Sequence, residues 1–129
     1  MDFKTLLRTG KPNDYLVADA DCLSAKPDRP ALSVPKPAPE VAAAIIAMAT
    51  AMPRVKLEYH DQNEHGLQFS EKSKLLGFVD DIFLKIVPGN DLTSCRVLYY
   101  SKSRVGYSDM GVNRRRGELW LKTVQAKFS

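Results

Sequence analysis

The sequence is poor in the residues that most often bind metals. Its 129 residues include two cysteines and two histidines, and Cys22 and Cys95 form no Cys-x-x-Cys pair. His60 and His65 stand apart from both cysteines, so the ligand spacing of a structural zinc site is missing. We therefore expect no metal ion and no cofactor. The sequence leaves open whether the two cysteines are free thiols or form one long-range disulfide.

Long apolar runs are missing as well. No stretch approaches the roughly 20 apolar residues that a membrane-spanning helix needs. The N-terminus carries Asp2 and has no apolar run longer than two residues before Tyr15, which is unlike the apolar segment of a secretion signal. These absences lead us to expect a cytoplasmic protein without a membrane span.

The net charge is small, at +4, and the composition of 44% hydrophobic and 26% charged residues is that of a folded globular protein. This length suits one domain with one core. The basic residues Arg54, Lys56, Lys72 and Lys74 are not interleaved with aromatic residues in the manner of a nucleic-acid site. We expect no nucleic acid as a partner, while an anionic partner remains compatible with the charge.

Prolines are concentrated near the N-terminus, because six of the eight lie between residues 10 and 39. Each proline removes a backbone donor and favours an extended conformation in the residue before it. We therefore divide the chain into an extended arm over 1–38, wrapped on the body, and a core domain over 39–129. Within the arm, residues 31–34 are the expected strand, at a sheet edge.

The rest of the chain alternates between helical and strand periodicity. Pro39, Glu40 and Pro53 are start and stop signals for a helix over 39–53. A period of two predicts strands over 54–61 and 66–70, with Val55, Leu57 and Tyr59 on one face. It also predicts two strands within 81–103, before a final helix over 112–128.

These elements predict an α+β fold with the order β-α-β-β-β-β-α. The simplest packing is an antiparallel sheet of four to five strands with both helices on one face. This order is that of TATA-box-binding-protein-like folds, an analogy that carries no functional argument by itself.

The final helix carries an unexpected residue on its apolar side. A helical wheel places Arg116 within that side and Gly117 near Val124. A glycine costs stability inside a helix, so Gly117 indicates a close backbone contact. The predicted apolar side consists of Val112, Leu119, Trp120, Val124 and Phe128.

Arg114, Arg115 and Arg116 occupy the first helical turn, where each exposed cation is disfavoured by about 0.3–1 kcal/mol. One interpretation is structural: Arg116 pairs with Asp80, Asp81 or Asp109 and fixes the helix to the sheet. The other is functional: Arg104, Arg114 and Arg116 converge on a pocket mouth, where free helix amides help to bind an anion. The candidate ligand-binding residues are then Arg104, Arg114, Arg116, Ser108 and Asn113.

Two segments of the sequence resemble a known family. "LLGFVDDIFLKIVP" and "YYSKSRVGYSDMGVNRRRGELWL" are similar to segments of the bacterial and plastid family catalogued as domain of unknown function 1499. Its members carry Gly-Phe-x-Asp and then Ser-Arg-x-Gly-x-Ser-Asp-x-Gly-x-Asn-Arg-x-Arg. The matching residues are Gly77, Phe78 and Asp80, then Ser103, Arg104, Gly106, Ser108, Asp109, Gly111, Asn113, Arg114 and Arg116.

The resemblance extends from about residue 12 onward, and Gly117 departs from it, since many relatives have Ile or Val there. It implies no activity, cofactor or ligand.

The residues supply no credible catalytic set, because there is no nucleophile elbow, P-loop or dinucleotide fingerprint. Carboxylates beside arginines have lowered pKa values and make poor general acids. We therefore expect a non-enzymatic module that holds a small anionic or lipid-like ligand near Arg104, Arg114 and Arg116. The alternative is a protein-interaction or assembly domain with an acidic partner; an enzyme acting through Asp80 and Asp109 is a third. The oligomeric state is open.

A simple criterion separates the first two interpretations. A cavity lined by Ile82, Leu84, Tyr99 and Trp120 would favour a small ligand held between sheet and helices. A solid core with an exposed arginine surface would favour a docked partner.

Overall fold

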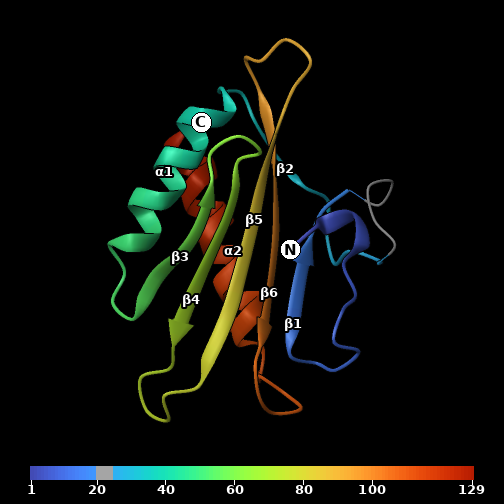
Figure 1. The fold of residues 1–129 in the computed structure, drawn as a ribbon, viewed down its shortest axis with the longest axis vertical. Helices are drawn as coiled ribbons and strands as arrows, with labels where there is room; N and C mark the ends of the chain where they lie inside the picture. Colours follow the sequence, from blue (N-terminus) through green and yellow to red (C-terminus); the bar gives the residue numbers. More distant parts are fainter. Residues whose placement is uncertain (20–24) are drawn as a thin grey trace.

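Six strands form one antiparallel sheet with two helices on one of its faces in the computed structural model, which describes residues 1–19 and 25–129 (Figure 1). The predicted α+β fold with two helices is thereby confirmed. The strand order is β1-β6-β5-β4-β3, and β2 also pairs with β6. The elements are η1 (Phe3–Thr5), β1 (Asp14–Val17), β2 (Leu32–Val34), α1 (Ala38–Thr50), β3 (Val55–Asp61), β4 (Gly66–Lys72), β5 (Val79–Pro88), β6 (Cys95–Ser103) and α2 (Val112–Lys127).

The sheet is larger than the predicted four to five strands, because the N-terminal segment contributes β1. Tyr15, Leu16 and Val17 are all buried, since β1 pairs with β6 and is covered on both faces. A strand buried on both faces shows no polar alternation, which is why sequence reasoning missed it. The division of the chain at residue 38 stays a prediction.

The main core lies between the sheet and the helices. Ile82, Leu84 and Ile86 of β5 are buried there, as the alternation in that strand predicts. Trp120 and Val124 of α2 pack against them. The other face of the sheet is partly covered by the N-terminal segment, where Phe3, Leu6, Leu16, Ala18, Leu98 and Tyr100 form a second buried cluster.

A β-bulge between Leu57 and Tyr59 corrects the prediction for β3. Val55 and Leu57 pack against the main core as expected. The bulge adds one residue to the strand and so reverses the side on which the next side chains lie. Tyr59 therefore points away from the helices and is 59% exposed.

Three residues of α2 also differ from the predicted apolar side. Leu119 is exposed and Leu121 is buried, because the sheet and α1 cover a stripe of the helix displaced from the one that the wheel selected. Val112 at the first turn is exposed as well.

None of the helices within the described residues is both long and apolar enough to cross a membrane. Cys95 is buried, and Cys22 lies outside the described residues.

Candidate functional site

Arg116 is the buried centre of a polar network between α2 and the sheet. Its side chain is 6% exposed, and its Nη2 lies 2.6 Å from Asp80 Oδ2 and 3.4 Å from Glu71 Oε2. Asp80 and Glu71 face each other across β5 and β4. Burial acts to lower the pKa of Arg116, but Tyr99 and the two carboxylates outweigh it and raise that pKa. Arg116 is therefore a charged residue that fastens the helix to two strands.

Asn113 extends this network to the N-terminal segment and to the loop before the helix. It is fully buried; its Oδ1 accepts a hydrogen bond from Arg116 Nη1 at 2.8 Å. Its Nδ2 donates to Asp109 Oδ2 at 2.7 Å, to Ser103 Oγ at 3.0 Å and to the Asn13 carbonyl at 3.1 Å. With its amide engaged on both sides, Asn113 acts as an internal brace and offers little to a ligand.

Asp109 satisfies the start of α2. Its carboxylate accepts hydrogen bonds from the backbone N–H groups of Gly111 at 2.8 Å and Asn113 at 3.0 Å. A carboxylate at this position compensates the positive end of the helix dipole. Of the three aspartates that sequence reasoning paired with arginines, Asp109 is thus the one that caps the helix.

Arg104 lies on the opposite face of the sheet from Arg116. Its guanidinium binds Asp81 through Nε at 3.1 Å and Nη2 at 2.8 Å, while Arg116 binds Asp80. Successive side chains of a strand point to opposite faces, so adjacent aspartates hold these two arginines on different sides. The Asp81 carboxylate raises the pKa of Arg104.

The other two arginines of the helix point outward. Arg114 is exposed, contacts Glu118 at 3.1 Å one turn along the helix and lies 6.0 Å from the centre of the Tyr15 ring. Arg115 Nη1 donates to the Met110 carbonyl at 2.9 Å. The exposed Ser108 accepts a hydrogen bond from the Met110 N–H at 3.3 Å. The structure therefore does not bring Arg104, Arg114 and Arg116 together at one pocket mouth, which corrects that part of the functional interpretation.

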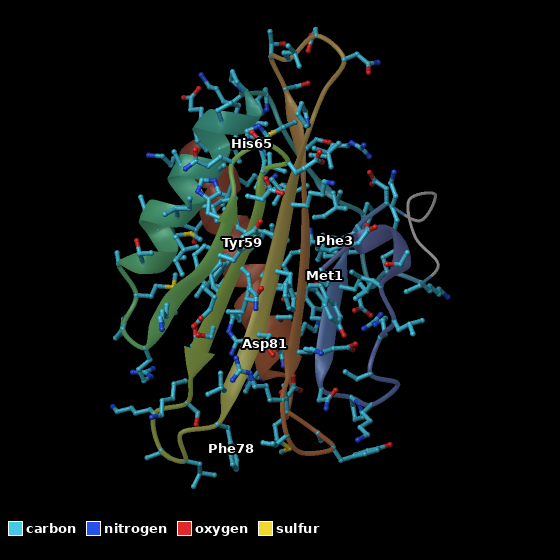
Figure 2. The ribbon with its side chains drawn as sticks, in the orientation of Figure 1. Met1, Phe3, Tyr59, His65, Phe78 and Asp81 are labelled. Carbon is cyan, nitrogen blue, oxygen red and sulfur yellow. The ribbon has the colours of Figure 1, made fainter. Side chains whose placement is uncertain are left out.

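Exposed apolar side chains gather instead on two connections at one end of the molecule. We call this surface the loop end. It consists of residues 72–78, from the last residue of β4 to the start of β5, and residues 104–112, from the end of β6 to the first residue of α2; both lie at the lower end of Figure 1. Figure 2 shows Phe78 at this end and His65 at the opposite one. Seven of the twelve exposed large hydrophobic residues of the described chain belong to it: Leu75, Leu76, Phe78, Val105, Tyr107, Met110 and Val112.

The two connections are braced against each other and against the N-terminal segment. The Arg104 N–H donates to the Val79 carbonyl at 3.2 Å, and the Asp109 N–H donates to the Pro12 carbonyl at 3.2 Å. Asn13 Nδ2 donates to the Gly106 carbonyl at 2.9 Å. The apolar side chains are thus presented on loops of fixed course.

The loop end is also cationic. The acidic side chains near it are engaged internally, since Glu71, Asp80 and Asp81 bind arginines and Asp109 caps α2. The exposed cations at this end are Lys72, Lys74, Arg104, Arg114 and Arg115. Arg104 pairs with Asp81 and Arg114 with Glu118, which leaves Lys72, Lys74 and Arg115 outside these ion pairs. Its accessible charge is therefore mainly positive.

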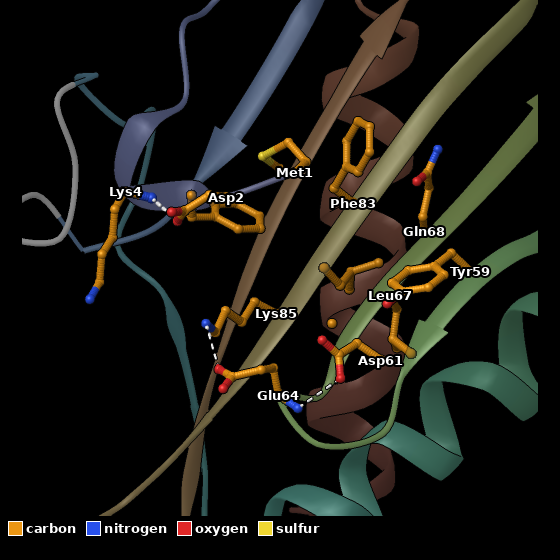
Figure 3. Close-up of a pocket in the computed structure, with 13 residues that line it drawn as sticks. Met1, Asp2, Lys4, Tyr59, Asp61, Glu64, Leu67, Gln68, Phe83 and Lys85 are labelled. Atoms are coloured by element: carbon orange, nitrogen blue, oxygen red, sulfur yellow. Dashed lines mark hydrogen bonds and ion pairs between the residues drawn. The ribbon is translucent and has the colours of Figure 1, made fainter.

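A hollow of about 370 Å³ lies on the open face of the sheet, beside Met1 and Phe3 (Figure 3). Tyr59 and Gln68 are paired across β3 and β4, and Gln68 is paired with Phe83 of β5. Lys85 and Glu64, 3.4 Å apart, close one side. Sequence reasoning missed this hollow because the bulge that turns Tyr59 outward leaves no signal in the alternation. None of the predicted ligand-binding residues lines it.

The core between sheet and helices is solid. Ile82, Leu84, Tyr99 and Trp120 are at most 2% exposed and belong to one packed cluster. The Trp120 ring packs edge-on against the rings of Phe69 and Tyr99, with distances between ring centres of 5.4 Å and 6.2 Å. Burial raises the pKa of Tyr99 to about 12, so its hydroxyl is neutral at physiological pH.

Within the described residues, no group of three or more His, Cys, Asp or Glu could hold a metal ion.

Comparison with known proteins identifies the family and the fold. The family model described as "Protein of unknown function (DUF1499)" matches residues 7–124, which confirms the resemblance in the sequence. No curated protein matches the chain. A solved structure from Nitrosospira multiformis, a Northeast Structural Genomics Consortium target, is similar with a TM-score of 0.57 and 12% sequence identity. The match covers 77% of this chain and 93% of that one, and at this identity it shows the fold alone.

Proposed function

We propose that this chain, which belongs to the DUF1499 family of proteins of unknown function, is a binding domain that docks through its loop end on an anionic partner. The observation that carries the proposal is the gathering of seven exposed apolar side chains on two braced connections, beside the exposed cations Lys72, Lys74 and Arg115. Monomeric proteins rarely expose contiguous apolar patches without an interaction to serve. The acidic side chains near the patch are paired inside the molecule, so they do not oppose an anionic partner.

A small ligand held between sheet and helices has less support. The four side chains that would line such a cavity, Ile82, Leu84, Tyr99 and Trp120, pack against one another. Arg116 is occupied by Asp80 and Glu71. The matching motif at the start of α2 then acts as a brace that shapes the loop end, with Arg104 and Arg114 at its border.

Three further expectations from the sequence remain predictions. A cytoplasmic location and the absence of nucleic acid among the partners stay predictions from composition. The likeness to TATA-box-binding-protein-like topology also stays a prediction and adds nothing to the function, because one fold hosts many functions.

Binding to polyglutamate, followed by fluorescence anisotropy of a labelled polymer, tests the proposal. The variant Lys72→Glu/Lys74→Glu reverses two exposed charges at the loop end. We expect its affinity to fall about tenfold or more, since each cation near an anionic surface contributes about 1 kcal/mol.

The matched control is Lys36→Glu/Lys122→Glu, which makes the same charge change at exposed positions outside the loop end. It should bind nearly as the unmodified chain does at moderate salt. Equal losses in both variants would show that net charge, and no particular surface, governs binding. No binding of polyglutamate or of anionic vesicles by the unmodified chain would contradict the proposed function.

A further inference from the structure

The apolar side chains of the loop end are strongly exposed. Leu75 is 90% exposed, Met110 81%, Leu76 73% and Tyr107 68%. None of these four residues lines the hollow at Tyr59 and Phe83 or the polar hollow beside Arg104 and Gly106. A groove would accept a peptide or a helix from a partner. Exposed side chains that protrude separately require a partner into which each of them can insert.

The exposed apolar side chains come from two connections at the same end of the molecule (Figure 1). The 72–78 connection is closed on itself, because the Ser73 N–H donates to the Phe78 carbonyl at 2.7 Å and the Phe78 N–H donates to Ser73 Oγ at 2.9 Å. The Arg104 N–H donates a hydrogen bond to the carbonyl of Val79, the residue that follows the 72–78 connection. Both connections end the molecule on the same side (Figure 1). Their tips can therefore meet one surface at the same time.

The chemistry of the tips is that of the membrane interface. Leucine, methionine and phenylalanine are apolar, and Tyr107 carries an aromatic ring with a polar hydroxyl, the type of residue enriched where lipid meets water. Lys72, Lys74 and Arg115 are exposed beside them, where cations gain from the negative potential of anionic headgroups. Such a surface lies in the interface without crossing the bilayer.

We propose that the anionic partner of the loop end is a lipid surface, into whose interface Leu75, Leu76, Phe78, Tyr107 and Met110 insert while the neighbouring cations contact the headgroups. This inference rests on the proposed function and names its partner class. An acidic protein is the competing partner, and the test below distinguishes the two.

The experiment is co-sedimentation of the full chain with vesicles of phosphatidylcholine, with or without phosphatidylglycerol. We expect binding to the anionic vesicles and weak binding to the neutral ones. The variant Leu75→Ser/Leu76→Ser should lower partitioning about tenfold to a hundredfold, since it removes two apolar side chains from the interface.

Leu7→Ser/Leu92→Ser is the matched control. Leu7 is 84% and Leu92 is 68% exposed, and both lie outside the loop end, so this variant should partition as the unmodified chain does. Because all four leucines are exposed, neither variant should lose its fold, which circular dichroism checks. A tryptophan introduced at position 75 (Leu75→Trp) gives a second readout, a blue-shifted and lipid-quenchable fluorescence when it inserts.

The outcomes separate the two proposals. Binding of polyglutamate without binding of anionic vesicles would overturn the lipid inference and leave the proposed function standing. Vesicle binding that Leu75→Ser/Leu76→Ser leaves unchanged, with no change in the fluorescence of the Leu75→Trp chain, would overturn insertion. Failure to bind either probe would overturn both proposals.

Discussion

At the scale of single residues, Arg116 carries the connection between α2 and the sheet. It binds carboxylates of two strands, Asp80 of β5 and Glu71 of β4, and one side-chain amide, that of Asn113. A buried guanidinium with such partners is tolerated because each charge has an opposite charge within contact distance. Removing it strands two carboxylates at a helix interface.

Arg116→Ala should lower the free energy of unfolding by about 3–5 kcal/mol, because uncompensated buried charge remains. For a domain of this size the melting temperature should fall by an amount on the order of 10 °C. Arg114→Ala is the control, since its exposed pair with Glu118 contributes less than about 1 kcal/mol. Thermal unfolding followed by circular dichroism gives both values, and similar melting temperatures for the two variants would contradict the structural role of Arg116.

Asp14 anchors the N-terminal segment, because its carboxylate accepts hydrogen bonds from the side chains of Arg8 and Tyr100. Burial acts to raise the pKa of Asp14, but hydrogen bonds from Arg8 and Tyr100 outweigh it and leave the pKa below its ordinary value of 3.8. A lowered folded-state pKa means that the unfolded chain binds the proton more readily. The stability contributed by Asp14 is thus present above pH 3.8 and is lost as the pH falls through the lower, folded-state value.

Urea unfolding at a series of acidic pH values measures this effect. The unmodified chain should lose stability toward low pH more steeply than Asp14→Asn, which is less stable near neutrality but has no carboxyl group to protonate. Parallel pH profiles for the two chains would show that Asp14 does not contribute in this way.

At the scale of elements, Gly117 sets how closely α2 approaches the sheet. A Cβ at this position would lie 2.6 Å from Tyr15 Cδ2 and 2.8 Å from Tyr99 Cε1. These distances are shorter than carbon atoms tolerate, so two aromatic rings occupy the space that a side chain would need. The contact predicted for this glycine is therefore made by ring edges on the helix backbone.

Gly117→Ala should destabilise the protein by about 1–3 kcal/mol through overpacking, although alanine favours a helix by about 1 kcal/mol over glycine. Gly66→Ala is the matched control, because a Cβ there meets its nearest atom, Asp61 Cβ, at 3.7 Å. Chemical denaturation compares the two. A stabilised Gly117→Ala chain would mean that helix propensity outweighs the contact.

The elements also show how far sequence reasoning extends. The helices and four of the strands follow from periodicity, since each buries one face against the other layer. The bulge at Leu57 and Tyr59 leaves no trace in the alternation, and β1 has none because both faces are covered. The arginines were expected together, yet Asp80 and Asp81 are adjacent in a strand and hold their partners on opposite faces.

The sequence analysis could name Asp80 as a candidate partner of Arg116, but it could not name Glu71. Pairing Glu71 with Arg116 requires the register of β4 against β5, which places Glu71 opposite Asp80. The loop end was missed for a related reason. Its apolar residues come from two connections far apart in the sequence, and only the fold brings them to one end (Figure 1).

At the scale of the whole molecule, the two ends differ in character. The loop end combines apolar tips with cations, while the opposite end carries the turn between β5 and β6 with a single exposed leucine, Leu92 (Figure 1). We therefore expect the molecule to bind in one orientation, with its long axis directed away from the partner surface.

Binding should also weaken with salt without being abolished by it. The attraction of exposed cations is screened, with a Debye length of about 10 Å at 0.1 M and about 3 Å at 1 M, whereas apolar insertion is not. Co-sedimentation with anionic vesicles over this range should thus show a decline to a residual level in the unmodified chain. A complete loss at high salt would indicate contact with headgroups alone.

The measurement that tests the central claim most directly is hydrogen–deuterium exchange of the full chain with and without anionic vesicles. The account predicts slower exchange in 72–78 and 104–112, with the remaining described segments unchanged. Slower exchange confined to the β5–β6 turn, or to the strands around the hollow at Tyr59 and Phe83, would contradict it.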